Sequence, residues 1–97
     1  MSILHTVNSS PFQTFSLQQC LAVLCEKDTL LLIEDGVIAS KVVCVNTPLL
    51  QQLAEEGRLM VLEPDSKARA INKFIGKSCS YADFVSLVCN HQSQIAW

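Results

Sequence analysis

The chain has 97 residues and a formal net charge of −2; 49% of its residues are hydrophobic and 16% are charged. This length predicts a single domain over residues 1–97 with one hydrophobic core. The seven lysine and arginine residues are scattered, which argues against direct binding of nucleic acid because phosphate recognition needs clustered cations.

The N-terminal part of the chain predicts a strand, a helix and a second strand. Residues 3–7 form the first strand, which a turn-like run at 8–11 closes. Ser16 has the spacing of a helix N-cap, with Gln19 three residues later. The continuous apolar run at 29–33 predicts a strand that is covered on both faces. The apolar face of the helix is predicted to consist of Leu17, Cys20, Leu21, Leu24 and Cys25.

The middle of the chain begins with an ambiguous segment. Residues 37–45 fit either a strand or a short helix followed by an extended stretch. Thr47 then predicts an N-cap with Pro48 at the first helical position, and Gly57 predicts the end of that helix. Residues 58–62 form the next predicted strand. The helix between them is predicted to bury Leu49, Leu50, Leu53 and Ala54.

The C-terminal part predicts two further helices separated by a short extended piece at 75–79. Asp65 is the predicted cap of the first, which extends to about Phe74. Ser80 and Asp83 have the capping-box spacing of the second. We expect Ile95 and Trp97, in the short tail at 92–97, to dock on this domain or to insert into a partner. The apolar face of the last helix is predicted to contain Tyr81, Phe84, Val85 and Val88.

Strands that alternate with helices along a chain predict right-handed crossovers. We therefore expect an α/β fold: one compact domain with a mostly parallel central sheet flanked by helices. A small domain with so few charges also has more apolar surface than one core can hide, which favours oligomerisation.

No part of the chain approaches the roughly 20 apolar residues that span a bilayer. The first residues also lack the features of a signal peptide, so we expect a cytoplasmic protein. The five cysteines include no C-x-x-C pair, which argues against a disulfide framework and against a zinc site. The three glycines are far apart and form no phosphate-binding loop. We expect neither a metal nor a cofactor.

Cys20 is the candidate for chemistry. It lies one turn into a predicted helix, where the helix dipole favours a thiolate that could attack or carry a sulfane sulfur. The alternative is packing, because Cys20 shares the apolar face with Leu17 and Leu21, and cysteine is often buried. The pattern favours packing for Cys20, and it also favours packing for Cys25, Cys44, Cys79 and Cys89.

Other candidate residues have plain structural interpretations. His5 is expected to be a satisfied histidine within a strand, and His91 to interact with the C-terminus of the last helix. Asp35 and Gly36 follow the second strand, so they belong to the edge of a parallel sheet where ligands and partners bind. A simple turn explains them equally well.

Several segments of the chain are distinctive: residues 1–8 and 10–12, the run LLLIEDGV at 30–37, YADFV at 81–85 and HQSQIAW at 91–97. Together they resemble the TusB/DsrH family of sulfur-relay proteins. The resemblance is collinear and covers nearly the whole chain. It departs in two places: relatives often have Ala-Arg-Gly where this chain has Ala68-Arg69-Ala70, and the segment from Asn72 to Cys79 is shorter.

This resemblance implies a compact α/β fold and a heterohexamer with TusC- and TusD-like (DsrF- and DsrE-like) homologous subunits. Such a complex relays persulfide sulfur from a TusA-like donor to a TusE-like acceptor, toward 2-thiouridine at the wobble position of tRNA. The main sulfur-carrying cysteine belongs to the TusD/DsrE subunit, so this chain would be chiefly a structural and docking subunit. Because DsrH-type members carry a cysteine at the position of Cys20, the resemblance also implies an auxiliary persulfide carrier there.

Three alternatives remain at this level. The chain could be a DsrH-like subunit of a complex in dissimilatory sulfur oxidation. It could be a stand-alone homo-oligomeric binding protein. It could also be a self-sufficient sulfurtransferase, which requires an accessible thiol that ionises below neutral pH.

Overall fold

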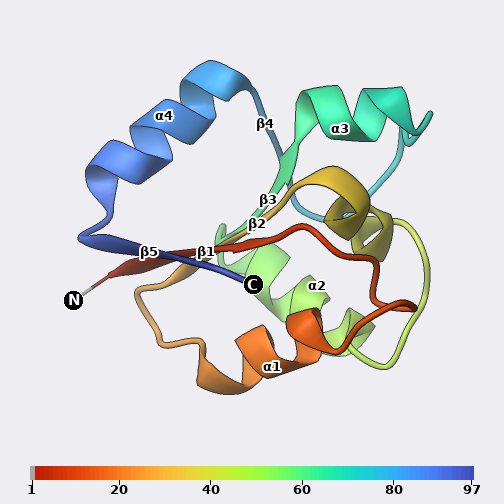
Figure 1. The fold of residues 1–97 in the computed structure, drawn as a ribbon, viewed down its shortest axis with the longest axis horizontal. Coiled ribbons are helices and arrows are strands. Elements are labelled where there is room, and N and C mark those ends of the chain that lie inside the picture. Colours follow the sequence, from red (N-terminus) through yellow and green to blue (C-terminus); the bar gives the residue numbers. More distant parts are fainter. Residues whose placement is uncertain (1) are drawn as a thin grey trace.

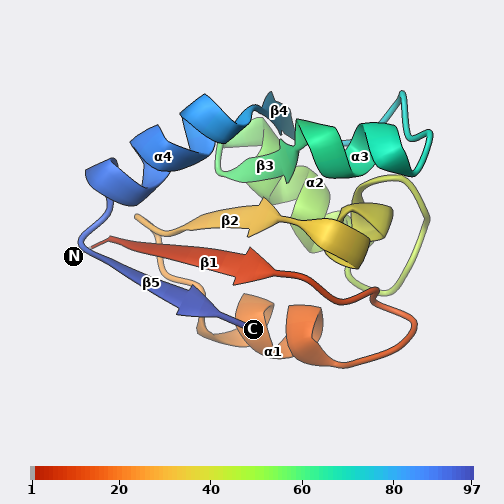
Figure 2. The same ribbon diagram turned by 45° about the horizontal axis from the view of Figure 1, so that its top comes forward.

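The computed structural model describes residues 2–97; Met1, the first residue of the N-terminal resemblance, lies outside the described residues. The described strands form one five-stranded sheet in the order β4-β3-β2-β1-β5, with every pair parallel (Figures 1 and 2). The strands are β1 (Ile3–Val7), β2 (Thr29–Leu32), β3 (Leu59–Leu62), β4 (Lys77–Cys79) and β5 (Ser93–Ala96). The helices are α1 (Ser16–Val23), the 3₁₀ helix η1 (Glu34–Ser40), α2 (Thr47–Glu55), α3 (Glu63–Ala68) and α4 (Tyr81–Asn90). The expected α/β fold is confirmed.

The sheet lies between two layers of helices. Helices α1 and α2 cover one face, and α3 and α4 lie on the opposite side (Figure 1). Every residue of β2 is buried, as predicted for an uninterrupted apolar strand: Leu30 and Leu32 pack toward α1 and α2, and Leu31 packs toward α4. Within residues 2–97, none of the helices is long and apolar enough to cross a membrane.

The capping pattern predicts the start of α4 correctly. The hydroxyl of Ser80 accepts the N–H of Asp83 at 3.1 Å, and the carboxylate of Asp83 accepts the N–H of Ser80 at 3.1 Å. The same reasoning is wrong for α1, where Ser16 is the first helical residue and Phe15 occupies the cap position without a side-chain bond. The loop before α1 explains the shift, because the hydroxyl of Thr14 accepts the N–H of Ser16 at 3.4 Å.

Two further helix boundaries differ from the prediction. Helix α3 begins at Glu63 and ends at Ala68, so the expected start at Asp65 and end near Phe74 are wrong. The side chain of Asp65 instead accepts the N–H of Glu34 at 2.6 Å. Helix α2 begins at Thr47 itself, whose hydroxyl accepts the N–H of Cys44 at 2.8 Å in the preceding loop.

The ambiguous segment proves to be a short helix followed by a loop. Helix η1 covers Glu34–Ser40, earlier than expected, and residues 41–46 continue to α2 without regular secondary structure. Leu49, Tyr81 and Val85, each predicted to lie on the buried face of a helix, are exposed. In α4 the side chains that pack on the sheet are Phe84, Leu87 and Val88, one helical stripe away from Tyr81 and Val85.

The tail docks on its own domain as a fifth strand. Strand β5 pairs in parallel with β1, and the indole of Trp97 packs against the core beneath the sheet. The prediction allowed docking but did not identify a strand. All four residues of β5 are exposed, because β5 is the edge of the sheet and pairs only with β1.

Helices α2 and α3 end in the same motif. Each is followed by a residue in the left-handed region, Gly57 with φ of 73° and Ala70 with φ of 54°. In both cases the N–H of that residue and the N–H of the next one donate to carbonyls of the last helical turn. Ala70 therefore keeps the conformation that suits the glycine of the relatives, with the strain of a Cβ in that region.

We expect Ala70→Gly to stabilise the protein by about 1 kcal/mol, because it removes this Cβ strain. The free energy of unfolding in urea measures the effect. Gly57→Ala is the matched control: nothing lies within 4 Å of the added Cβ, so strain alone should destabilise the protein by about 1 kcal/mol. Equal signs for the two substitutions would contradict this account.

Candidate functional site

The pair Asp35–Gly36 lies at the carboxyl end of β2, in the first turn of η1. The Asp35 carboxylate accepts two hydrogen bonds from Arg69, at 3.0 Å from Nε and 2.8 Å from Nη2. A Cβ on Gly36 would lie 2.1 Å from the carbonyl oxygen of Val7, so only glycine lets η1 approach β1 this closely. These contacts support the interpretation of Asp35 and Gly36 as a structural turn.

Cys20 lies on the inner face of α1 and is fully buried among Leu17, Leu30 and other core residues. Burial first, and the negative charge of Asp28 second, raise the pKa of its thiol to about 12. In this conformation the thiol is protonated near neutral pH and is closed to solvent. The geometry is that of a packed core cysteine, and a carrier role for Cys20 requires α1 to move away from the sheet.

The other cysteines divide into two groups. Cys79 is buried, as the pattern predicted, and burial raises the pKa of its thiol. Cys44 is partly buried in the loop before α2. Cys25 and Cys89 are exposed, so the packing prediction is wrong for both. Cys25 lies beyond the end of α1, and Cys89 lies on the outer side of α4, which explains why neither reaches the core.

Asp28 is the buried charged residue beside Cys20. Its carboxylate accepts three hydrogen bonds: from the N–H of Ile3 at 3.0 Å, the N–H of Cys25 at 3.0 Å and Nε2 of His5 at 2.9 Å. Burial opposes ionisation of this carboxyl, but the three bonds outweigh burial and lower the pKa of Asp28. Asp28 thus joins the start of β1 to the turn between α1 and β2.

His5 connects Asp28 to the C-terminal strand. The indole N–H of Trp97 donates to Nδ1 of His5 at 3.1 Å, and the two rings stack with centroids 6.2 Å apart. Because an indole nitrogen only donates, Nδ1 must accept and carries no proton. The proton of the neutral ring is therefore on Nε2, where it is donated to Asp28. The prediction of a satisfied structural histidine at position 5 is confirmed.

His91 also has a structural position. Its Nδ1 lies 2.6 Å from the carbonyl oxygen of Leu87 in the last turn of α4, which agrees with the expected contact at the helix C-terminus. Its Nε2 lies 3.0 Å from the hydroxyl of Thr29 in β2. His91 thus joins the end of α4 to the sheet.

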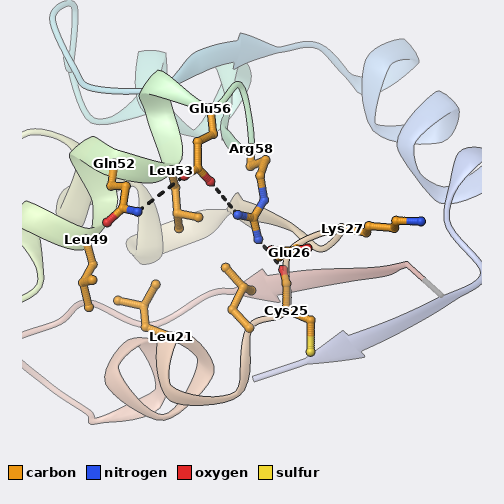
Figure 3. A pocket seen from close by; sticks show the side chains of 10 residues that line it. Leu21, Cys25, Glu26, Lys27, Leu49, Gln52, Leu53, Glu56 and Arg58 are labelled. Atoms are coloured by element: carbon orange, nitrogen blue, oxygen red, sulfur yellow. Dashed lines mark hydrogen bonds and ion pairs between the residues drawn. The ribbon is translucent and has the colours of Figure 1, made fainter.

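A cleft opens between the end of α1 and helix α2 (Figure 3). Its volume is about 630 Å³, and its apolar wall includes Leu21 and Leu49. Arg58 closes one side: it donates to the carbonyl oxygens of Cys25 and Asp28 and pairs with Glu56 at 2.6 Å. Because the guanidinium is already occupied by these three acceptors, the cleft offers no free cation from Arg58.

Two long segments that meet at the surface carry no charged residues. The segments 6–25 and 42–54 contain no aspartate, glutamate, lysine or arginine. In both ribbon views the loop 8–15 lies beside the loop 41–46, next to α1 and the start of α2 (Figures 1 and 2). We call this surface the uncharged face. Its exposed large apolar side chains are Phe12, Phe15, Val23, Val43, Val45 and Leu49.

Comparison with known proteins identifies the family. A family model described as "DsrH like protein" matches residues 9–94. Protein TusB of Pectobacterium parmentieri is 36% identical over 98 residues, and Protein TusB of Yersinia pestis (strain Pestoides F) is 37% identical over 98 residues. Protein TusB of Pectobacterium atrosepticum is 34% identical over 99 residues. Each alignment covers 98% of this chain and 100% of the relative. The chain belongs to the DsrH-like family.

Sequence reasoning missed two features of this DsrH-like chain. Asp28 has no local signal, because an aspartate before a strand usually marks only a turn. The uncharged face does have a signal, namely the two long segments without charges, but only the fold brings them together. Cys20, Asp35 and Gly36 were recognised; the structure buries Cys20 beneath α1 and places Asp35 and Gly36 in the first turn of η1.

Replacing Asp28 by asparagine should destabilise the DsrH-like chain by about 3 kcal/mol at neutral pH. An amide can accept from Ile3, but its NH₂ group would face the donors of Cys25 and His5. Because the folded-state pKa of Asp28 lies below the ordinary value of 3.8, its contribution is complete above that pH and is lost as the pH falls through the folded value. The difference between the two proteins should therefore shrink in acid, as measured by urea unfolding at several pH values.

Asp35→Asn is the matched control for this substitution. Asp35 is half-exposed and pairs with Arg69 at the surface, so its loss should cost less than about 1 kcal/mol. An equal effect of the two substitutions, or no effect of Asp28→Asn, would show that the hydrogen bonds of the Asp28 carboxylate do not stabilise the fold.

Proposed function

We propose that this DsrH-like chain is a mainly structural and docking subunit of a cytoplasmic sulfur-relay complex. The complex would pass persulfide sulfur toward 2-thiouridine at the wobble position of tRNA. Membership of the DsrH-like family supports the relay role. The structural observation that carries the subunit role is the uncharged face.

The uncharged face has the properties of a surface that a partner covers. Phe15 is 75% exposed and Val43 is 86% exposed, and both lie in the two segments without charged residues, 6–25 and 42–54. Exposed apolar patches of this kind mark interaction sites, and charged residues are depleted at the centres of interfaces. An apolar face on a small domain therefore fits a lasting contact with another subunit.

The proposed neighbours are TusC- and TusD-like (DsrF- and DsrE-like) homologous subunits in a heterohexamer. A TusA-like donor and a TusE-like acceptor would reach the chain through that complex. No direct contact with tRNA is proposed, because the lysines and arginines are scattered and three of them, Arg58, Lys67 and Arg69, are paired with carboxylates.

Val43→Lys should weaken assembly with TusC- and TusD-like subunits at least tenfold, because it places a charge on the uncharged face. Val85→Lys is the control, since Val85 is also exposed but lies on α4 across the sheet. Native mass spectrometry of the mixed subunits measures both. Both substitutions are at exposed positions, so the variants should fold like the parent protein.

Each outcome has a clear meaning. If assembly is unchanged by Val43→Lys but is weakened by Val85→Lys, the interface lies on α4 instead of on the uncharged face. If the parent chain does not bind these partners and forms only homo-oligomers, the result would favour the stand-alone homo-oligomeric binding protein.

The alternative pathway is dissimilatory sulfur oxidation with a DsrH-like subunit. The uncharged face would serve as a docking surface in either complex. Sulfite-reductase genes beside the gene of this protein would favour oxidation, and loss of 2-thiouridine from tRNA after deletion of the gene would favour the thiolation pathway.

Cys20 as an auxiliary persulfide carrier remains part of the proposal, on the resemblance alone. Since its thiol is buried with a pKa of about 12, we expect alkylation near neutral pH to modify Cys25 and Cys89 in the isolated chain and to leave Cys20 intact. Mass spectrometry of the peptides measures this order. If Cys20 also stays free of sulfur in a complex that relays it from a persulfide donor, the carrier role is wrong.

A further inference from the structure

Strand β5 is held on the sheet by few interactions. It pairs only with β1, and none of its four side chains is buried. Backbone bonds close both ends of the pairing, from Gln92 N–H to the carbonyl oxygen of Ser2 at 3.1 Å and from Trp97 N–H to that of Thr6 at 2.9 Å. The indole of Trp97 is therefore the main side-chain anchor of the strand.

That anchor depends on a histidine without a proton on Nδ1. The indole N–H of Trp97 needs Nδ1 of His5 as its acceptor. Protonation of His5 places an N–H on Nδ1, so two donors would face each other and the Trp97 bond would be lost. The bond from Nε2 to Asp28 would remain and would become charge-assisted. Protonation of His5 thus weakens the attachment of β5 to the sheet, whereas the bond between His5 and Asp28 near the start of β1 remains.

We propose that His5 and Trp97 form a proton-sensitive latch, which holds β5 firmly on the sheet when His5 is neutral and weakens that hold when His5 is protonated. The backbone N–H and C=O groups that pair β5 with β1 then open to solvent more often. This latch is independent of the proposed sulfur relay, because it uses neither a cysteine nor the uncharged face.

The charged and titratable groups around His5 keep their state while His5 changes. Asp28, on the turn before β2, stays ionised because its hydrogen bonds lower its pKa despite burial. Cys20, on α1, stays neutral because burial and Asp28 raise its pKa to about 12. Arg58, before β3, donates to the carbonyl oxygen of Asp28 and is always charged.

The test follows Trp97 in the intact chain, where it is the single tryptophan. We expect its fluorescence and its indole N–H resonance to change in one transition during a pH titration, together with the ring resonances of His5. The protection factor of the Trp97 amide should fall about tenfold across that transition, as expected for the loss of a buried hydrogen bond. The amide of Leu30, which donates to the carbonyl oxygen of Arg58 inside the sheet, should keep its protection.

The two histidines of the chain supply matched variants. His5→Gln offers one acceptor and one donor that do not titrate, so it should abolish the transition. His91→Gln changes the histidine that contacts Leu87 and Thr29, and it should leave the transition unchanged.

The proposal is overturned if the transition persists in His5→Gln or disappears in His91→Gln. It is also overturned if His5 takes up its proton in the parent protein while the Trp97 indole and amide signals stay constant. This last measurement uses no variant, so it decides the matter even if His5→Gln does not fold.

Discussion

The carboxylate of Asp28 is buried among groups that each need an acceptor: the N–H of Ile3, the N–H of Cys25 and Nε2 of His5. A buried charge is tolerated only when such bonds satisfy it, so the start of β1, the turn after α1 and the ring of His5 must keep their positions together. Through His5 the same constraint reaches Trp97 and the edge strand β5. The side chain of Asp28 thus fixes the relative positions of the start of β1, the turn before β2 and, through His5, strand β5.

This arrangement has a consequence for cysteine chemistry. Asp28 opposes the thiolate of Cys20, since two negative charges would lie near each other in a dry core. The residue that stabilises the sheet edge therefore also keeps Cys20 protonated while α1 is closed. A role in sulfur transfer that needs Cys20 must separate α1 from β2, whereas a docking role needs no such movement because the uncharged face is already exposed.

The parts of the fold that were predictable are those with a local cause. The run at 29–33 is apolar throughout and became β2, and Ser80 with Asp83 formed the capping box of α4 because both partners lie within one turn. Strand β5 was not predictable in this way, since Ser93–Ala96 is short and exposed and exists through its pairing with β1 at the other end of the chain. The role of Asp28 was not predictable for the same reason, because its hydrogen-bond partners come from positions 3, 5 and 25, which only the tertiary fold brings together. Cys20 was predictable as a buried residue from its helical stripe, but the effect of Asp28 on its thiol was not.

The distribution of charge explains why the composition pointed to association. A low charged fraction spread over the whole surface would give a uniformly apolar protein that aggregates without specificity. Here all charged residues lie outside segments 6–25 and 42–54, in η1, α3, β4, α4, the end of α2 and the connecting turns. The fold places the loops of these two segments side by side, so positions without charge gather on one face. Apolar surface gathered on one face in this way suits a specific partner, because the charged remainder excludes other orientations of the same contact.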